Sequence, residues 1–180
     1  MDTDTDADRG PARTDAAGAY DRFAAEAGSY GVALTRVAPA DAADAIADAV
    51  EPPAVGTPLP WEDVALPEVV GTDPTPTDLD AAVTGVTPAS LAVAEYGSIV
   101  LETDEHGSEP VSLFNDRHVA VLREADIVPG MADAFERFGE EFRETRGSAI
   151  VATGPSATAD MGALVQGAHG PKAVEVVVVE

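Results

Sequence analysis

Apolar residues in the first third of the chain predict a helix, a strand and a second helix. Between residues 16 and 27 they recur at spacings of three and four, which is typical of a short amphipathic helix. Residues 31–37 alternate in polarity and predict a strand. After Pro39, a segment rich in alanine and aspartate predicts a helix that ends before Pro52 and Pro53.

The middle of the chain is interrupted by prolines. The pattern between Pro52 and Pro76 predicts an irregular connection with one helical turn around residues 60–65. Short apolar runs follow at 81–86 and 90–94, before the strand predicted at 98–102.

Strands and helices alternate through the second half. Strands are predicted at 98–102, 117–123, 149–152 and 173–179, with a helix that starts at Pro129 and ends near residue 145. Between the last two strands we expect a glycine-rich loop, a short helix and a second glycine-rich loop. This alternation predicts an α/β fold, in which an open, mainly parallel or mixed sheet carries helices on both faces.

The domain organisation follows from length and composition. A chain of 180 residues fits one domain. Residues 1–14 lack apolar periodicity and are predicted to be a disordered acidic N-terminus, so residues 15–180 form the single α/β domain.

The charge predicts adaptation to a salt-rich cytoplasm. The net charge is −23, with 33 acidic residues against 10 basic ones, of which only Lys172 is a lysine. Molar salt shortens the Debye length to about 3 Å and so screens the repulsion between carboxylates. An acidic protein with a disordered acidic tail is the alternative, but it does not explain the acids at 40–80 and 102–144. The charge disfavours binding to nucleic acids and to anionic membranes.

The sequence also predicts a cytoplasmic location. It contains no run of 18 apolar residues, and its N-terminus lacks the basic and then apolar pattern of a signal segment. The absence of cysteine excludes disulfides, thiolate nucleophiles and cysteine-bound iron–sulfur clusters within this chain.

The segment TGPSATAD is the first candidate for ligand binding. It follows a predicted strand, and ligands of open α/β sheets bind beyond the carboxyl ends of strands. Gly154 permits close approach of the backbone and Pro155 makes the turn rigid, while Ser156 or Thr158 can offer a hydroxyl; Asp160 closes the motif. These residues fit a pocket for an anion or carboxylate, and they fit a capped strand-to-helix turn equally well.

The segment QGAHGP is the second candidate. It holds His169 between Gly167 and Gly170, where neighbouring side chains shield the imidazole poorly. His169 can act as a general acid or base, or donate a hydrogen bond to an anion, or else bond a backbone carbonyl that fixes the loop. No metal site is predicted, because His106 and His118 lack ligand spacing with His169.

The segment AEYGS is the third candidate. Glu95 ends an apolar run, and burial there would raise its pKa and suit nucleophilic or acid–base catalysis. The alternative is a structural carboxylate that bonds a backbone N–H. His118, at the start of an apolar strand, is interpreted as a core histidine. Ser156 and His169 are predicted to line one concave site.

Several motifs in this order resemble the LUD domain family. They are AEYGSIVL at 94–101, RHVAVL at 117–122, and GPSATAD followed closely by GAHGP. The resemblance is to the small C-type subunit of that family, and it covers residues 80–180 well and 16–79 loosely.

The resemblance implies a fold similar to that of sugar-phosphate isomerases and coenzyme A transferases. It also implies a part in oxidising L-lactate to pyruvate, together with two companion proteins that carry iron–sulfur clusters. No cofactor is then expected in this chain, and a small carboxylate is the expected ligand. The resemblance does not say whether this subunit is itself an enzyme.

Two other functions fit the same residues. One is a stand-alone transferase or isomerase in which Glu95 is the nucleophile or base and the glycine-rich loops bind the substrate. The other is a purely structural interaction domain, for which no stabilisation by lactate, pyruvate or sugar phosphates is expected.

Overall fold

Six parallel strands form the main sheet of the protein. The structure is a computed structural model that describes residues 18–145, 147–160 and 163–180. Across this sheet the strands follow the order β1 (Ala33–Val37), β12 (Ala173–Val179), β7 (Arg117–Arg123), β4 (Thr84–Ala89), β2 (Ala54–Gly56) and β3 (Val70–Thr72). The predicted α/β class with a mainly parallel open sheet is confirmed.

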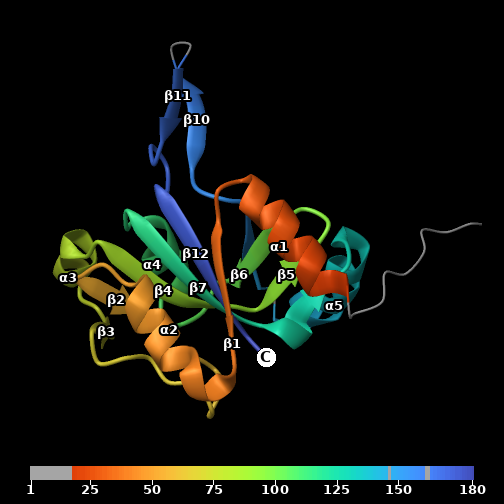
Figure 1. Ribbon diagram of the computed structural model, residues 1–180, viewed down its shortest axis with the longest axis horizontal. Helices are drawn as coiled ribbons and strands as arrows, with labels where there is room; N and C mark the ends of the chain where they lie inside the picture. The colour runs from red at the N-terminus through yellow and green to blue at the C-terminus, as the bar shows by residue number, and fades with distance from the viewer. Residues whose placement is uncertain (1–17, 146, 161–162) are drawn as a thin grey trace, which may run out of the picture.

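A second sheet and a hairpin complete the β-structure. The second sheet has the order β8 (Ile127–Val128), β5 (Leu91–Val93), β6 (Ser98–Glu102) and β9 (Ala149–Ala152). Within the described residues, strands β10 (Ala157–Asp160) and β11 (Ala163–Gln166) pair only with each other, and their hairpin projects from the body of the protein (Figure 1).

Five α-helices surround the sheets. They are α1 (Ala19–Ser29), α2 (Ala42–Ala49), α3 (Pro76–Ala81), α4 (Ser108–Leu113) and α5 (Met131–Thr145) in the described residues, and two 3₁₀ turns lie at Pro39–Asp41 and Glu124–Asp126.

Alternate residues of β12 point into two different apolar cores. Val178 packs in a core with Phe23 of α1, whereas Val177 packs in another core with Ile46 of α2. All four side chains are fully buried, and each burial stabilises the fold by about 1.5–3 kcal/mol. The predicted cover of helices on both faces is therefore present, but the α1 face is shared with the second sheet. Phe138 of α5 packs on the opposite side of that sheet.

Several sequence-based expectations were wrong in detail. The strand at 149–152 exists, but it lies in the second sheet rather than in the main sheet with β12. A hairpin replaces the short helix expected after Pro155. Residues 60–65 contain an isolated turn and no helix. The short strands β2 and β3 and the helices α3 and α4 were not predicted. Residues 1–14 lie outside the described residues.

Helix α4 packs closely on β4 because a glycine faces it. A Cβ atom at Gly85 would lie 2.0 Å from the backbone oxygen of Val111 in α4. A larger residue would have to displace the helix. This contact sets α4 beside the amino ends of β4 and β7.

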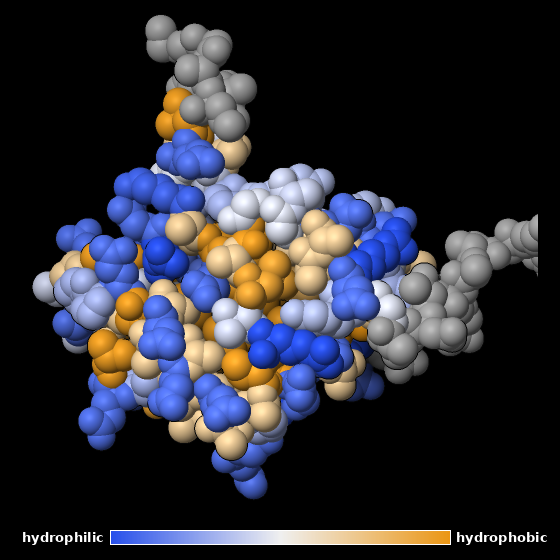
Figure 2. All heavy atoms as spheres, in the orientation of Figure 1, coloured by the Kyte–Doolittle hydropathy of each residue, from blue (hydrophilic) through white to orange (hydrophobic). Residues whose placement is uncertain are grey.

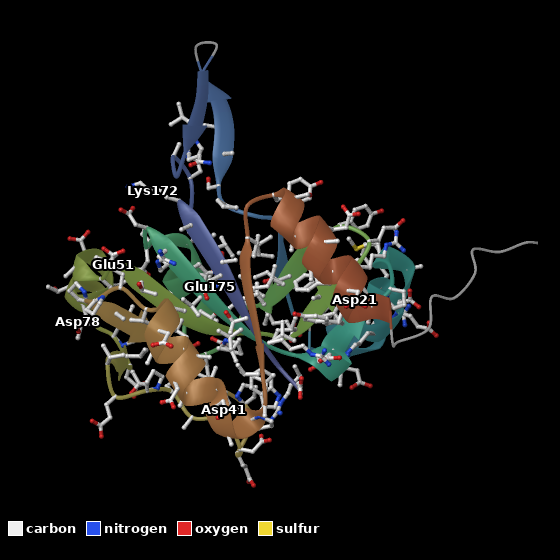
Figure 3. The ribbon with its side chains drawn as sticks, in the orientation of Figure 1. Asp21, Asp41, Glu51, Asp78, Lys172 and Glu175 are labelled. Atoms are coloured by element: carbon white, nitrogen blue, oxygen red, sulfur yellow. The ribbon has the colours of Figure 1, made fainter. Side chains whose placement is uncertain are left out.

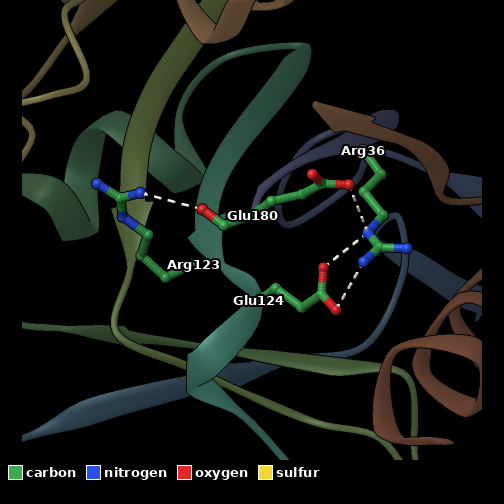
Figure 4. Close-up of polar contacts among 4 residues, drawn as sticks. All are labelled: Arg36, Arg123, Glu124 and Glu180. Carbon is green, nitrogen blue, oxygen red and sulfur yellow. Dashed lines mark hydrogen bonds and ion pairs between the residues drawn. The ribbon is translucent and has the colours of Figure 1, made fainter. Parts of the chain in front are cut away.

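Ionic contacts join the carboxyl ends of three strands (Figure 4). Arg36, in β1, makes two hydrogen bonds to the carboxylate of Glu124, of 2.6 and 2.9 Å, and a 3.3 Å ion pair with Glu180. Arg123, in β7, donates to the backbone oxygen of Glu180 over 3.4 Å. The hydrogen bond with Glu124 raises the pKa of Arg36.

Carboxylates are spread over distant parts of the surface. Asp21 lies on α1, Asp41 precedes α2 and Asp78 lies on α3, and all three are exposed (Figure 3). Hydrophilic residues cover much of the face drawn in Figure 2, and apolar residues gather near its centre between α1 and α2. The acidity is therefore a property of the folded body as well as of the N-terminal segment.

Candidate functional site

A cavity of about 510 Å³ lies at the amino ends of β7 and β12, on the side of the main sheet that faces the second sheet. This volume is in the range of small-molecule sites. Its lining comes from both sheets and from the two glycine-rich loops: Tyr30, Val32, Gly97, Ile99, Leu101, Ser112, Leu113, His118, Ala152, Thr153, Gly154, Pro155, Ser156, Ala157, Gln166, His169, Gly170, Pro171, Val174 and Val176.

The two glycine-rich loops lie against each other at this cavity. The N–H of Ser156 donates to the carbonyl of Pro171 over 2.8 Å, and the N–H of Gly167 donates to the carbonyl of Ser156 over 2.9 Å. A Cβ atom at Gly170 would lie 3.2 Å from that of Ser156. Ser156 and His169 both line the cavity, so the predicted meeting of their loops is confirmed.

The way in which the loops meet differs from the prediction. The TGPSATAD segment follows β9 of the second sheet and continues into β10, so no helix N-terminus faces the cavity. The N–H of Ser156 bonds to Pro171 and is not free for an anion. The cavity also lies at amino ends of parallel strands, not at their carboxyl ends.

Gly154 shapes the turn after β9. Its φ is +68°, in the left-handed region that favours glycine. A Cβ atom there would lie 2.8 Å from the Cβ atom of Tyr30, which follows α1. Gly154 therefore allows the loop to close one wall of the cavity against the end of α1.

His118 lines the cavity, although the sequence predicted only a core histidine at this position. It lies in β7 with 2% of its surface exposed, and its Nε2 is 2.9 Å from Oγ1 of Thr87 in β4. Burial lowers its pKa to about 4, so its ring is neutral at pH 7. The interpretation as a core histidine is correct, yet His118 also lines the cavity. The signal in the sequence was its position near the start of an apolar strand.

The other polar side chains of the described lining are those of Tyr30, Ser112, Thr153, Ser156, Gln166 and His169. Ser156 is half-buried, and His169 is exposed. Thr153 shares a 2.7 Å hydrogen bond with Ser98, which holds its hydroxyl against β6. The described lining contains no Asp, Glu, Lys or Arg. Lys172 is nearby in sequence, but its Nζ pairs with Asp116 over 2.8 Å.

Some predicted binding residues are not part of the lining. Thr158 pairs with Val165 inside the hairpin, and Gly167 supports the loop without lining the cavity. The side chain of Asp160 lies outside the described residues. Gly154, Pro155, Ser156 and Gly170 are the predicted ligand-binding residues that do line it.

Glu95 lies apart from this cavity lining. Its side chain is 46% exposed, and one of its carboxylate oxygens lies 3.8 Å from the guanidinium of Arg22 in α1. The backbone N–H of Glu95 donates to the carbonyl of Pro129 over 3.1 Å. The buried environment considered from sequence is therefore absent, and the structure does not bring Glu95 together with Ser156 and His169.

The profile of the LUD domain matches residues 75–179 of this sequence. The chain belongs to the LUD domain family. The match includes both glycine-rich loops and every strand from β4 to β12. Helix α1 lies outside the matched region, as does Tyr30, which follows α1 and lines the cavity.

Curated relatives extend the similarity of this LUD chain. It is 35% identical over 160 residues to lactate utilization protein C of Deinococcus radiodurans, covering 83% of this chain and 74% of that protein. It is 36% identical over 91 residues to lactate utilization protein C of Bacillus velezensis, covering 48% of this chain and 38% of that protein.

A solved structure agrees with the fold of the LUD chain. A DUF162 family protein from Deinococcus radiodurans superimposes with a TM-score of 0.73 at 26% sequence identity, covering 93% of this chain and 99% of that chain. The described part of the LUD chain contains no group of three or more His, Cys, Asp or Glu side chains suited to hold a metal ion. Within the same residues, no helix is long and apolar enough to cross a membrane.

Proposed function

We propose that this LUD chain acts in lactate utilisation and binds a small carboxylate in the cavity between its glycine-rich loops. The names of its curated relatives support the pathway. The composition of the cavity supports the ligand class, and the two lines of support are independent.

The absence of acidic side chains from the described lining of the cavity is the observation that carries the proposal. The net charge of −23 repels anions from the protein as a whole. The described residues that line this cavity include two histidines and several hydroxyls but no acidic side chain. An anion in this cavity therefore meets no carboxylate among the described lining residues.

The polar and apolar groups of the cavity suit L-lactate or pyruvate. Ser156 and His169 lie at the loops and can donate hydrogen bonds to a carboxylate. Val174 and Val176 of β12 give an apolar wall for the methyl group. His118 is neutral and lies at the inner end, where its ring can bond to a hydroxyl or keto oxygen.

We further propose that the electrons of lactate oxidation pass to companion iron–sulfur proteins. Conversion of L-lactate to pyruvate releases two electrons and two protons, and the chain has no cysteine to hold a cluster. In this proposal the chain is a cytoplasmic subunit that contributes a binding site and not a redox centre.

Ligand binding is tested by the thermal midpoint in the presence of L-lactate or pyruvate. Each potassium salt should raise the midpoint more than KCl at the same ionic strength, because a ligand that binds only the folded state stabilises it. Ser156→Ala and His169→Ala should weaken this rise, whereas His106→Ala should preserve it. Equal effects of lactate and KCl on the native protein would refute carboxylate binding.

The pathway assignment needs a separate experiment in the native host. Tagged protein, purified at the salt concentration of its cytoplasm, should bring down an iron–sulfur protein, and deletion of its gene should impair growth on lactate. Failure of both results would exclude the role in lactate utilisation, whatever the outcome of the ligand titration.

A further inference from the structure

A second cavity lies at the opposite edge of the main sheet. It measures about 450 Å³ and adjoins the carboxyl ends of β2 and β4. Its lining combines apolar residues, which are Pro58, Leu59, Pro60, Trp61, Pro88 and Ala89, with polar residues, which are Ser90, Glu102, Asp104, His106 and Ser108.

The strand order explains why a crevice opens at this place. From β2 the chain passes to β3, which lies next to β2 at one edge of the sheet. The main-sheet strand that follows β4 in the chain is β7, which lies on the other side of β4, away from β2. The connections after these two neighbouring strands therefore diverge. Such a switch point, beyond the carboxyl ends of parallel strands, is where open α/β sheets bind ligands.

A chain of hydrogen bonds holds polar residues of this second cavity in place. The hydroxyl of Ser108 donates to the carboxylate of Asp104 over 2.5 Å, and lies 2.9 Å from the hydroxyl of Thr57 at the end of β2. Ser108 and Thr57 are 2% and 1% exposed. The backbone N–H groups of His106 and Ser108 donate to the same carboxylate, each over 3.0 Å.

The second cavity, unlike the first, has carboxylates among its described lining residues. Burial alone would raise the pKa of Asp104, but the hydrogen bonds from Ser108 and from the N–H of His106 outweigh it, so the pKa is lowered. Asp104 is therefore ionised at neutral pH, and Glu102 adds a second carboxylate to the lining. Anions such as lactate are repelled here, whereas an ammonium group is attracted.

We propose that the cavity at the ends of β2 and β4 is a second binding site, for a small molecule that joins a positively charged amine to an apolar or aromatic group. The amine lies against Asp104 and Glu102, and the apolar group lies against Leu59, Trp61 and the neighbouring prolines. This site does not depend on the carboxylate cavity, so either proposal can fail without the other.

The fluorescence of Trp61 reports on this site directly, because Trp61 is the single tryptophan of the chain. Benzylamine serves as the cationic probe, with benzyl alcohol and benzoate as neutral and anionic probes of similar shape, all at one KCl concentration. Benzylamine should change the emission saturably. Benzyl alcohol should bind about tenfold more weakly, as expected for the loss of one charge-assisted hydrogen bond, and benzoate should have no saturable effect.

Charge variants separate a specific site from general attraction to an acidic protein. Asp104→Asn and Glu102→Gln should each weaken the benzylamine response about tenfold. Asp21→Asn, an equal charge change on α1, should leave it unchanged. Glu102→Gln keeps the test valid if Asp104→Asn disturbs the start of α4. An equal loss in Asp21→Asn, a matching response to benzoate, or no saturable response to benzylamine would overturn the proposal.

Discussion

Nε2 of His118 lies 2.9 Å from Oγ1 of Thr87, and both side chains are almost fully buried between two neighbouring parallel strands. Burial lowers the pKa of His118 to about 4, from 6.5 in an exposed histidine. The neutral ring is therefore part of the folded state, and its protonation opposes folding.

This burial predicts a loss of stability in mild acid. The unfolded chain binds a proton at His118 below pH 6.5, whereas the folded protein does so only near pH 4. The contribution is complete above pH 6.5 and falls with pH through that window, by about 2 kcal/mol at pH 5. Chemical denaturation at pH 7 and pH 5 measures it.

Histidine variants isolate the source of this pH dependence. His118→Gln should lose about 2 kcal/mol of the difference between pH 7 and pH 5, whatever its absolute stability. His106→Gln removes an exposed histidine and should retain the native difference. If His118→Gln keeps the full pH dependence, the lowered pKa is not its cause.

The hydroxyl of Thr87 is predicted to stabilise the fold through His118. Thr87→Val keeps the shape of the side chain but leaves Nε2 of His118 without its partner, which should lower the free energy of unfolding by about 1–3 kcal/mol. Thr72→Val, at an exposed position of the edge strand β3, is the matched control and should stay within about 0.5 kcal/mol. Equal effects of the two changes would mean that the hydrogen bond contributes nothing.

Gly154 is predicted to be essential for the wall of the first cavity. Gly154→Ala places a Cβ atom 2.8 Å from that of Tyr30, at a φ of +68°. This should cost about 1–3 kcal/mol of unfolding free energy and weaken any ligand effect on the midpoint. Gly28 lies in α1 with no atom within 4 Å of an added Cβ. Gly28→Ala should instead stabilise the protein by about 0.5–1 kcal/mol, and a similar loss in both variants would contradict this reasoning.

The net charge of −23 predicts stabilisation by salt. The thermal midpoint should rise from low to molar KCl as the repulsion between surface carboxylates is screened. The double variant Asp48→Lys and Glu68→Lys, which reduces the net charge, should gain less from the same KCl. A native midpoint that is flat or falls with KCl would refute adaptation to high salt.

Local sequence pattern was sufficient for β1, β7 and β12, which are three of the six strands of the main sheet. The apolar run of 173–179 predicted a strand covered on both faces, and the structure places Val177 and Val178 in two separate cores. The apolar segment 117–123 was likewise assigned correctly as β7. These predictions succeed because a strand that is buried on both faces carries apolar side chains at consecutive positions.

Pairing between distant segments could not be predicted in this way. The strand at 149–152 has the apolar pattern of a buried strand, but nothing in its four residues specifies pairing with β6 instead of β12. The short strands β2 and β3 were missed, because three residues each give too little periodicity and their partners are distant in sequence.

The residues of the two cavities were likewise only partly predictable from the sequence. Glycine and histidine in TGPSATAD and QGAHGP marked residues of the first cavity in advance, since such loops leave side chains poorly shielded. The sequence could not show that His118 reaches this cavity, or that Ser108 meets Thr57 across 51 residues of chain at the second. Those contacts depend on strand order, because parallel neighbours bring together side chains that share no local pattern.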